Sequence, residues 1–169
     1  GYLDDSSRYI TLVRRKELFR HWRSAVIRSS LELPMRFLIR SPVQKQIYSL
    51  LANNEGESCL ALFQAAEALG LGHVSGVPPY VYVPKLPQPT DKKWRALVAA
   101  SSSEMPDLIV RQALSPKSVF RGAVHQNHSF VSDVIQVWLD VANHPSRGQE
   151  QANLIYEKVL RPIVGGEIQ

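Results

Sequence analysis

Apolar and polar positions along this chain change their period several times, and each change predicts an element. The predicted strands are residues 8–13, 34–40, 80–83, 108–113 and 118–124. Helices are predicted over residues 14–28, 91–100, 133–142 and 147–160, and a further helix is predicted to begin at Ser41-Pro42. Residues 59–70 are predicted to form a short strand that runs into a helix ended by Gly70. Interleaved strands and helices predict an α+β or α/β fold: a mixed sheet of about four to five strands packed with helices, ending in two consecutive helices.

The helix predicted over 133–142 carries apolar side chains almost all the way round, which is typical of a buried helix. Ser132 is its expected N-cap. After the first turn only Gln136 and Asp140 are polar, and their i, i+4 spacing puts them on one side. A carboxylate on a buried helix needs a partner, because an unpaired one costs several kcal/mol or becomes protonated. The expected partner is Arg147, across the turn that follows.

The last predicted helix begins at 147 with a capping box made by Ser146 and Gln149. A glycine in its first turn lowers helix propensity, which predicts the close approach of another backbone or side chain. The predicted polar cluster consists of Gln136, Asp140, Arg147, Gly148 and Glu150. Two interpretations stay open: a hydrogen-bonded structural lock that fixes the angle between the helices, and a site for a ligand or partner.

Composition places the chain among ordinary globular proteins. It has 169 residues, 44% of them apolar and 21% charged, which suits a single domain with a basic arm over 1–40 and the main body over 41–169. Cys59 is the only cysteine, so neither an internal disulfide nor a multi-cysteine zinc site can form, which fits a reducing cytoplasm. No apolar run approaches the roughly 20 residues of a membrane span. The acidic start is not a secretion signal.

The net charge of +5 belongs entirely to the N-terminal quarter of the chain. Residues 1–40 hold nine of the twenty Lys and Arg but only four of the fifteen acids, and the remaining residues are neutral overall. In the predicted helix, Lys16, Arg20 and Arg23 form a basic ridge opposite an apolar stripe. The predicted nucleic-acid contacts are Arg14, Lys16, Arg20 and Arg23. An ordinary solvated helix face is the alternative interpretation.

Other motifs carry little chemistry. His125 and His128 lie in a predicted loop, with His144 further along, and lack the frame of a metal site, so we expect no metal and no cofactor. The glycines between 70 and 76 follow a helix instead of joining a strand to a helix, which is the wrong order for a dinucleotide-binding loop.

An enzyme acting on nucleic acid or nucleotides is the alternative to a binding protein. Such an enzyme, of the metal-dependent nuclease kind, would use Asp107, Asp140 or Glu150 to hold a divalent ion. Asp107 opens a predicted strand, but the segment 117–124 that follows contains no acidic residue. A second carboxylate at that position is what a nuclease site of this type requires.

One C-terminal motif resembles a known family. Residues 131–140, VSDVIQVWLD, contain a serine and a Gln-x-x-x-Asp helix, and 147–152, RGQEQA, open the last helix with Arg-Gly-x-Glu-x-Ala. This pattern resembles the C-terminal region of the AbiEi family, which comprises antitoxins and transcriptional regulators of type IV toxin–antitoxin systems. Residues 16–19 with Trp22 look like the family's helix after its DNA-binding domain, and Tyr82-Val83 like its mid-domain strand.

The resemblance implies a non-enzymatic antitoxin or transcriptional-regulator domain that acts by binding. Family members usually begin with a winged helix-turn-helix, and Gly1 lies about where that domain would end, so we expect a fragment or a natural variant without it. Sequence-specific DNA binding is therefore not carried over. The first expected partner is nucleic acid, bound through the basic ridge or through the winged-helix domain that this chain is expected to lack. The second is a cognate toxin, to which the family is linked functionally. No membrane is expected, and a homodimer is compatible with this view.

Overall fold

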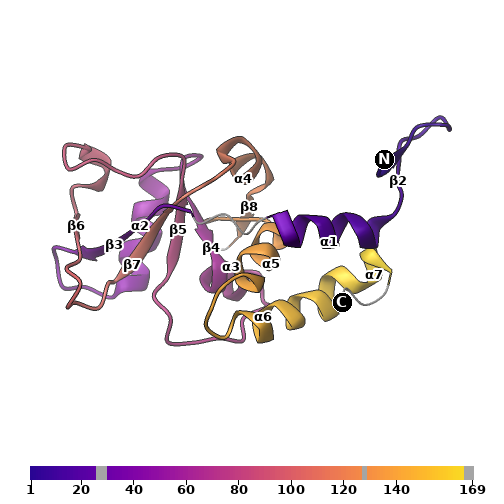
Figure 1. The fold of residues 1–169 in the computed structure, drawn as a ribbon. Helices are drawn as coiled ribbons and strands as arrows, with labels where there is room; N and C mark the ends of the chain where they lie inside the picture. The colour runs from indigo at the N-terminus through magenta and orange to yellow at the C-terminus, as the bar shows by residue number, and fades with distance from the viewer. Residues whose placement is uncertain (26–29, 127–128, 166–169) are drawn as a thin grey trace.

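A mixed sheet forms the centre of the molecule (Figure 1). The computed structural model describes residues 1–25, 30–126 and 129–165, and within them seven strands form this sheet in the order β6-β3-β7-β5-β4-β9-β8. The strands are β3 (Glu32–Phe37), β4 (Cys59–Ala61), β5 (Tyr80–Val83), β6 (Leu97–Ala99), β7 (Leu108–Gln112), β8 (Val124–Gln126) and β9 (Ser129–Val131). The mixed α/β class is confirmed, but the sheet is wider than the predicted width of about four to five strands.

Strand register divides the side chains of the sheet between two faces. β7 runs parallel to β5, and β9 runs parallel to β4, while the other neighbours are antiparallel. Tyr82 of β5 lies between Cys59 of β4 and Arg111 of β7, and Glu32 of β3 pairs with Arg111. These four side chains share one face, because residues directly opposite each other in neighbouring strands point to the same side.

Helices cover both faces of the sheet. Helix α5 (Val134–Ala142) reaches the face that carries Tyr82, since Asp140 bonds to the Tyr82 hydroxyl, and it packs against α3 (Leu62–Ala68) and α6 (Gly148–Ile155). Helix α2 (Val43–Asn53) lies on the other side of the strands in Figure 1. β5 is buried at every position, because a strand covered on both faces has no solvent-facing side chains.

Two segments adopt a different structure from the predicted one. The helix expected over 91–100 is a 3-10 turn, η1 (Lys92–Trp94), followed by β6. Trp94 and Leu97 are both buried, and their spacing of i, i+3 imitates a helical face although it arises from a turn and a strand. The strand expected over 118–124 is helix α4 (Pro116–Gly122), which begins with proline in its first turn.

The loop expected over 125–129 belongs to strand structure in part. β8 and β9 pair antiparallel from Val124 opposite Val131 to Gln126 opposite Ser129, at one edge of the sheet. His125 lies in β8 with its ring against Phe130, whereas His128 is outside the described residues. A polar sequence therefore formed an edge strand, where solvent-facing side chains are tolerated.

The C-terminal helices agree with the prediction except at their ends. α5 is capped by Asp133, whose carboxylate accepts from the amides of Ile135 and Gln136, whereas the predicted cap, Ser132, donates to the carbonyl of Leu60. α6 continues through a π-helical turn, η2 (Tyr156–Leu160), into α7 (Arg161–Val164). Pro162 does not stop the helix; it is the second residue of α7 and directly follows the π-helical turn η2.

The N-terminal segment forms an arm beside the C-terminal helices. Helix α1 (Arg15–Ala25) lies along α7 and α5, and the hairpin of β1 (Leu3–Asp4) and β2 (Thr11–Leu12) extends beyond it, away from the sheet (Figure 1). The predicted helix extends to residue 28, but 26–29 lie outside the described residues. Phe19 is the single buried residue of α1 in the described range.

Candidate functional site

Asp140 is a buried carboxylate at the interface between α5 and the sheet. Its side chain is 4% exposed. Its Oδ1 atom accepts hydrogen bonds from the Tyr82 hydroxyl and from Gln136 Nε2, each at 2.9 Å. The guanidinium of Arg111 lies 4.0 Å from the same oxygen. The i, i+4 pair that the sequence predicted is confirmed as a contact, and it is completed by residues from β5 and β7.

Arg111 connects this carboxylate to β3. Its Nη2 atom lies 2.6 Å from Glu32 Oε1, its Nε atom donates to the same oxygen at 2.8 Å, and its guanidinium lies over the ring of Tyr80 at 5.3 Å. Two anions and an aromatic face therefore surround one planar cation. We name the group the Asp140 network: Glu32, Tyr82, Arg111, Gln136 and Asp140.

Burial controls the ionisation of the Asp140 network. Desolvation raises the pKa of Asp140 to about 6, against the opposing effects of Arg111 and the hydrogen bonds from Tyr82 and Gln136. Burial likewise raises the pKa of Tyr82, with the Asp140 charge adding to it. Burial alone would lower the pKa of Arg111, but its anionic neighbours raise it. Oδ2 of Asp140 has no hydrogen-bond partner among the described residues, which further disfavours the anion.

The predicted partner of Asp140 is wrong. Arg147 is exposed, with a left-handed backbone at φ 57°, so the turn before α6 directs it away from the interface. Glu150 is also exposed, and its carboxylate lies 3.8 Å from the ring of His73. The capping box is absent as well, because α6 starts without a side-chain cap. The residues on α5 thus bond to the sheet and not to the next helix.

The close approach predicted at Gly148 is confirmed. A Cβ atom at this position would lie 2.0 Å from the carbonyl oxygen of Val141 and 3.0 Å from Cβ of His144. Only glycine lets the start of α6 contact the end of α5 at this distance, since any side chain would overlap the backbone. The turn between the two helices is therefore fixed by backbone contact at Gly148.

Three members of the Asp140 network were missed in the sequence. Glu32, Tyr82 and Arg111 stand on three strands, and Tyr82 is separated from Asp140 by 58 positions. One signal was present: Arg111 lies inside the apolar strand predicted over 108–113, where a cation needs an anionic partner. Gln151 was missed too; it is fully buried and bonds to the carbonyl of Leu71 and the amide of His73.

The three carboxylates of the nuclease-like alternative occupy different surroundings. Asp140 is enclosed in its network, Asp107 accepts from the amide of Phe37 at 2.8 Å, and Glu150 lies on the surface of α6. Within the described ranges, no group of three or more His, Cys, Asp or Glu side chains is placed to hold a metal ion. The Asp140 network joins α5 to β5 and β7 through side-chain contacts.

His144 packs against core residues, and Cys59 is part of the core. The ring of His144 contacts the rings of Phe63 and Tyr80 edge-on. Cys59 is fully buried, and desolvation raises the pKa of its thiol to about 12, with the charge of Asp140 adding to this shift. A thiol with so high a pKa is not a nucleophile at neutral pH.

The predicted basic ridge is on the surface, but its residues differ in their contacts. Arg14 donates to the carbonyl of Gly1 and lies 5.9 Å from the ring of Tyr2, and Arg23 donates to Gln149 of α6 at 3.1 Å. Lys16 and Arg20 form no hydrogen bond or ion pair with the part of the chain that the structure describes. Two of the three ridge residues, Lys16 and Arg20, are therefore available to an external anion.

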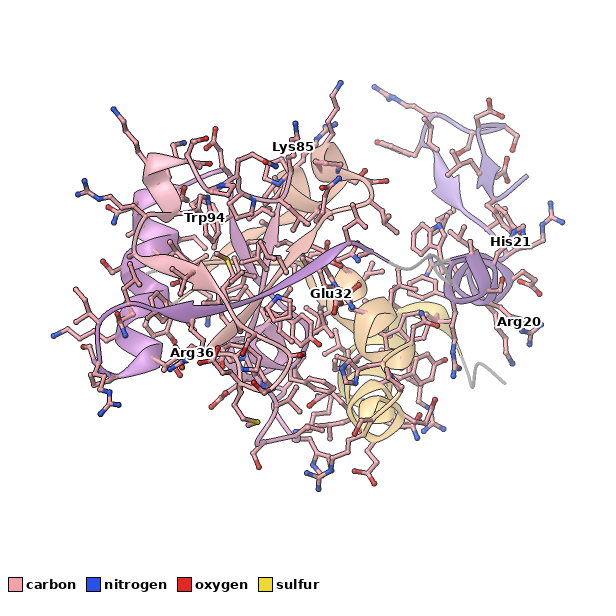
Figure 2. All side chains as sticks on the ribbon, turned by 60° about the vertical axis from the view of Figure 1, so that its left-hand side comes forward. Arg20, His21, Glu32, Arg36, Lys85 and Trp94 are labelled. Atoms are coloured by element: carbon pink, nitrogen blue, oxygen red, sulfur yellow. The ribbon has the colours of Figure 1, made fainter. Side chains whose placement is uncertain are left out.

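The apolar stripe of α1 is narrower than predicted. Phe19 is buried against Trp138 at a ring distance of 5.9 Å, but Trp22 is 39% exposed and Ala25 is exposed. α1 is thus turned so that Lys16 and Arg23 lie beside the contact with α5 and α7, and both are half-buried. Arg20 lies on the side of α1 that faces away from the sheet (Figure 2).

That outward side of α1 is hollowed. A hollow of about 220 Å³ is lined by Glu17, Arg20, His21 and Ser24, which lie on successive turns of the helix.

Over the described ranges, no helix has both the length and the apolar character needed to cross a membrane. The chain matches no protein-family model, no curated protein and no solved structure.

Proposed function

We propose that this chain is a non-enzymatic binding domain of the antitoxin and transcriptional-regulator type, and that its arm contacts nucleic acid. The observation that carries the proposal is the placement of charge: the whole net excess of +5 lies in residues 1–40, and Lys16 and Arg20 lie on α1 without a partner among the described residues. Cations that the protein does not neutralise itself attract phosphate groups.

The remainder of the molecule supports a role in binding over a role in catalysis. The best candidate for an acid or a metal ligand, Asp140, is enclosed by Tyr82, Gln136 and Arg111. The C-terminal motif that resembles the AbiEi family consists largely of residues that join α5 and α6 to each other and to the sheet. On this proposal the motif holds in place the helices against which α1 packs. The protein works in the cytoplasm, and its link to a toxin is functional.

The test measures binding to duplex DNA as a function of salt. The variant Lys16→Ala/Arg20→Ala/Arg23→Ala is compared with Lys45→Ala/Lys92→Ala/Arg95→Ala, which removes the same charge at exposed positions outside residues 1–40. We expect the slope of log K against log salt to fall by about 2 to 3 in the ridge variant, and by less than about 1 in the control. Equal slopes in the two variants would remove α1 from the nucleic-acid interface.

A second experiment addresses the antitoxin part of the proposal. Growth is followed while the product of the neighbouring gene, tested as the toxin, is expressed with the wild-type chain or with the ridge variant. Rescue by the wild-type chain is expected. Failure to rescue, with the protein folded and expressed, would contradict the antitoxin assignment and leave the nucleic-acid interface to the salt experiment.

A further inference from the structure

Two side chains around the hollow on α1, Arg20 and His21, offer hydrogen-bond donors to the same volume, because the Ser24 hydroxyl donates to the carbonyl of His21. Arg20, His21 and Ser24 line it from consecutive turns of the helix, together with Glu17. Figure 2 shows Arg20 and His21 on the side of α1 away from the sheet, with His21 next to the N-terminal hairpin. Neighbours at i, i+3 and i+4 on a helix lie close enough to contact one small ligand together.

Arg20 is the cation of the hollow. It forms no hydrogen bond or ion pair with any described residue, in contrast to Arg15, Arg23 and Arg36, which donate to Ile163, Gln149 and Glu104. A guanidinium presents donors in a planar fork that matches two oxygens of a phosphate. Its charge and its five donors are thus open to a ligand.

His21 is oriented by the hairpin. Its Nδ1 atom lies 2.9 Å from the hydroxyl of Tyr2, and the two rings meet edge-on at 6.2 Å. We assign the Tyr2 hydroxyl as the donor, so the neutral imidazole carries its proton on Nε2. Nε2 then remains as a donor for the hollow, and Tyr2 acts as a positioning residue for it.

Glu17 sets the affinity of the hollow for an anion. Its carboxylate lines the same volume as Arg20 and has no ion pair among the described residues. Its negative charge offsets the positive charge of Arg20, so we expect the hollow to bind a phosphate weakly and only in addition to other contacts. A weak subsite suits a nucleic acid, in which several phosphates bind at once, better than an isolated phosphate ion.

We propose that this hollow is a subsite for one phosphate of a nucleic-acid backbone, held by Arg20 and His21 and weakened by Glu17. The inference rests on the proposed nucleic-acid-binding function and names where on α1 the backbone contacts the protein. The occupant is a phosphodiester, because residues 1–25, which form the hairpin and α1 around the hollow, hold six Lys and Arg against three acids, and the only acid lining the hollow is Glu17.

The first experiment measures duplex DNA affinity for single variants with opposite expected effects. Arg20→Ala is expected to lower the affinity about tenfold and to reduce the salt slope by about 1, whereas Arg20→Lys is expected to retain part of the affinity. Glu17→Gln is expected to raise the affinity several-fold by removing the repelling charge. Arg95→Ala is the matched control, since it removes an exposed guanidinium outside residues 1–40.

The second experiment observes the hollow directly. The ring nitrogens of His21 and Nε of Arg20 are followed by NMR while duplex DNA or inorganic phosphate is added to the wild-type chain. DNA is expected to shift both signals saturably, and inorganic phosphate to shift them only weakly. Tyr2→Phe is expected to change the tautomer signature of the His21 ring nitrogens and to reduce the DNA-induced shift at Nε2, although the fold is retained.

The outcomes separate the subsite from the function on which it rests. If the ridge variant loses DNA binding but Arg20→Ala behaves as Arg95→Ala, the subsite is overturned and nucleic-acid binding stands. If DNA shifts neither His21 nor Arg20, or if Glu17→Gln weakens binding, the subsite is overturned as well. If inorganic phosphate binds the hollow as tightly as duplex DNA, the ligand is a free anion and the backbone assignment fails.

Discussion

The Asp140 network and the α1 surface place similar polar residues under opposite conditions. In the network, a carboxylate, a guanidinium, a phenol and an amide are removed from water and bond to one another. On α1, the Glu17 carboxylate, the Arg20 guanidinium and the His21 imidazole are exposed to water; among the described residues Glu17 and Arg20 form no ion pair, and His21 is bonded only through Nδ1 to the Tyr2 hydroxyl. Burial, and not residue type, therefore distinguishes a structural contact from a surface that can bind a ligand.

The two regions also meet physically, through aromatic rings. Phe19 of α1 packs on Trp138 of α5, and Trp138 lies 6.3 Å from the ring of Tyr156. The same helix therefore carries Asp140 toward the sheet and supports α1 on another side. Disruption of the network is expected to affect stability globally, whereas disruption of α1 is expected to act locally.

Removal of the buried carboxylate has the largest expected effect. Asp140→Ala leaves Arg111 without one of its anions and removes the acceptor of Tyr82 and Gln136, so we expect a loss of about 3 kcal/mol in the free energy of unfolding. Denaturant unfolding at neutral pH measures it. Asp140→Asn keeps a hydrogen-bond acceptor without the charge, so its free energy of unfolding is expected to lie within about 1 kcal/mol of the wild-type value. A loss well under 1 kcal/mol for Asp140→Ala would show that the network does not hold α5.

The pH dependence of stability tests the cost of ionising Asp140. Because burial raises its pKa to about 6 in the folded state, the folded protein binds the proton more tightly than the unfolded chain between about pH 4 and pH 6. This contribution is fully present below the unfolded pKa and is lost as pH rises through about 6. We expect the stability of wild type relative to Asp140→Asn to fall by about 2–3 kcal/mol from pH 4 to pH 7. A flat difference would place Asp140 in contact with water.

Phe19→Ala sharpens the contrast between local and global effects. It removes the only buried side chain of α1 in the described range, so we expect the free energy that keeps this helix docked to fall by about 2 kcal/mol. This is less than the roughly 3–5 kcal/mol lost when a phenylalanine is removed from the centre of a core, because few other apolar contacts hold α1. Amide hydrogen exchange of α1 and the fluorescence of Trp22 measure the release. Exchange in β5 and β7 is the internal control. Equal acceleration in the sheet would contradict an independently docked arm.

The smallest expected effect distinguishes the paired from the unpaired cations of α1. Arg23→Ala removes the hydrogen bond to Gln149 and is expected to cost less than about 1 kcal/mol. Arg20→Ala removes no protein contact and is expected to leave the stability unchanged while it weakens DNA binding. Thermal unfolding of both variants provides the comparison. A larger loss for Arg20→Ala than for Arg23→Ala would show that the hollow has a structural role.

Local patterns in the sequence predicted the central elements well. The strand over 80–83 coincides with β5, and the segment 59–70 is a strand followed directly by a helix, because β-branched and aromatic runs and a glycine terminator are short-range signals. The segments 91–100 and 118–124 were mispredicted. In both, a few apolar residues fit two periods, and packing against the sheet decided between them.

The sequence by itself determined that α5 is buried, that its carboxylate needs a cation, that a backbone approaches Gly148, and that the net charge lies in the first quarter of the chain. Only the tertiary structure decided that the cation is Arg111 of β7 and not the nearer Arg147. The reason is physical: periodicity shows that a side chain is buried, but its partner depends on strand order and register, which bring distant residues together.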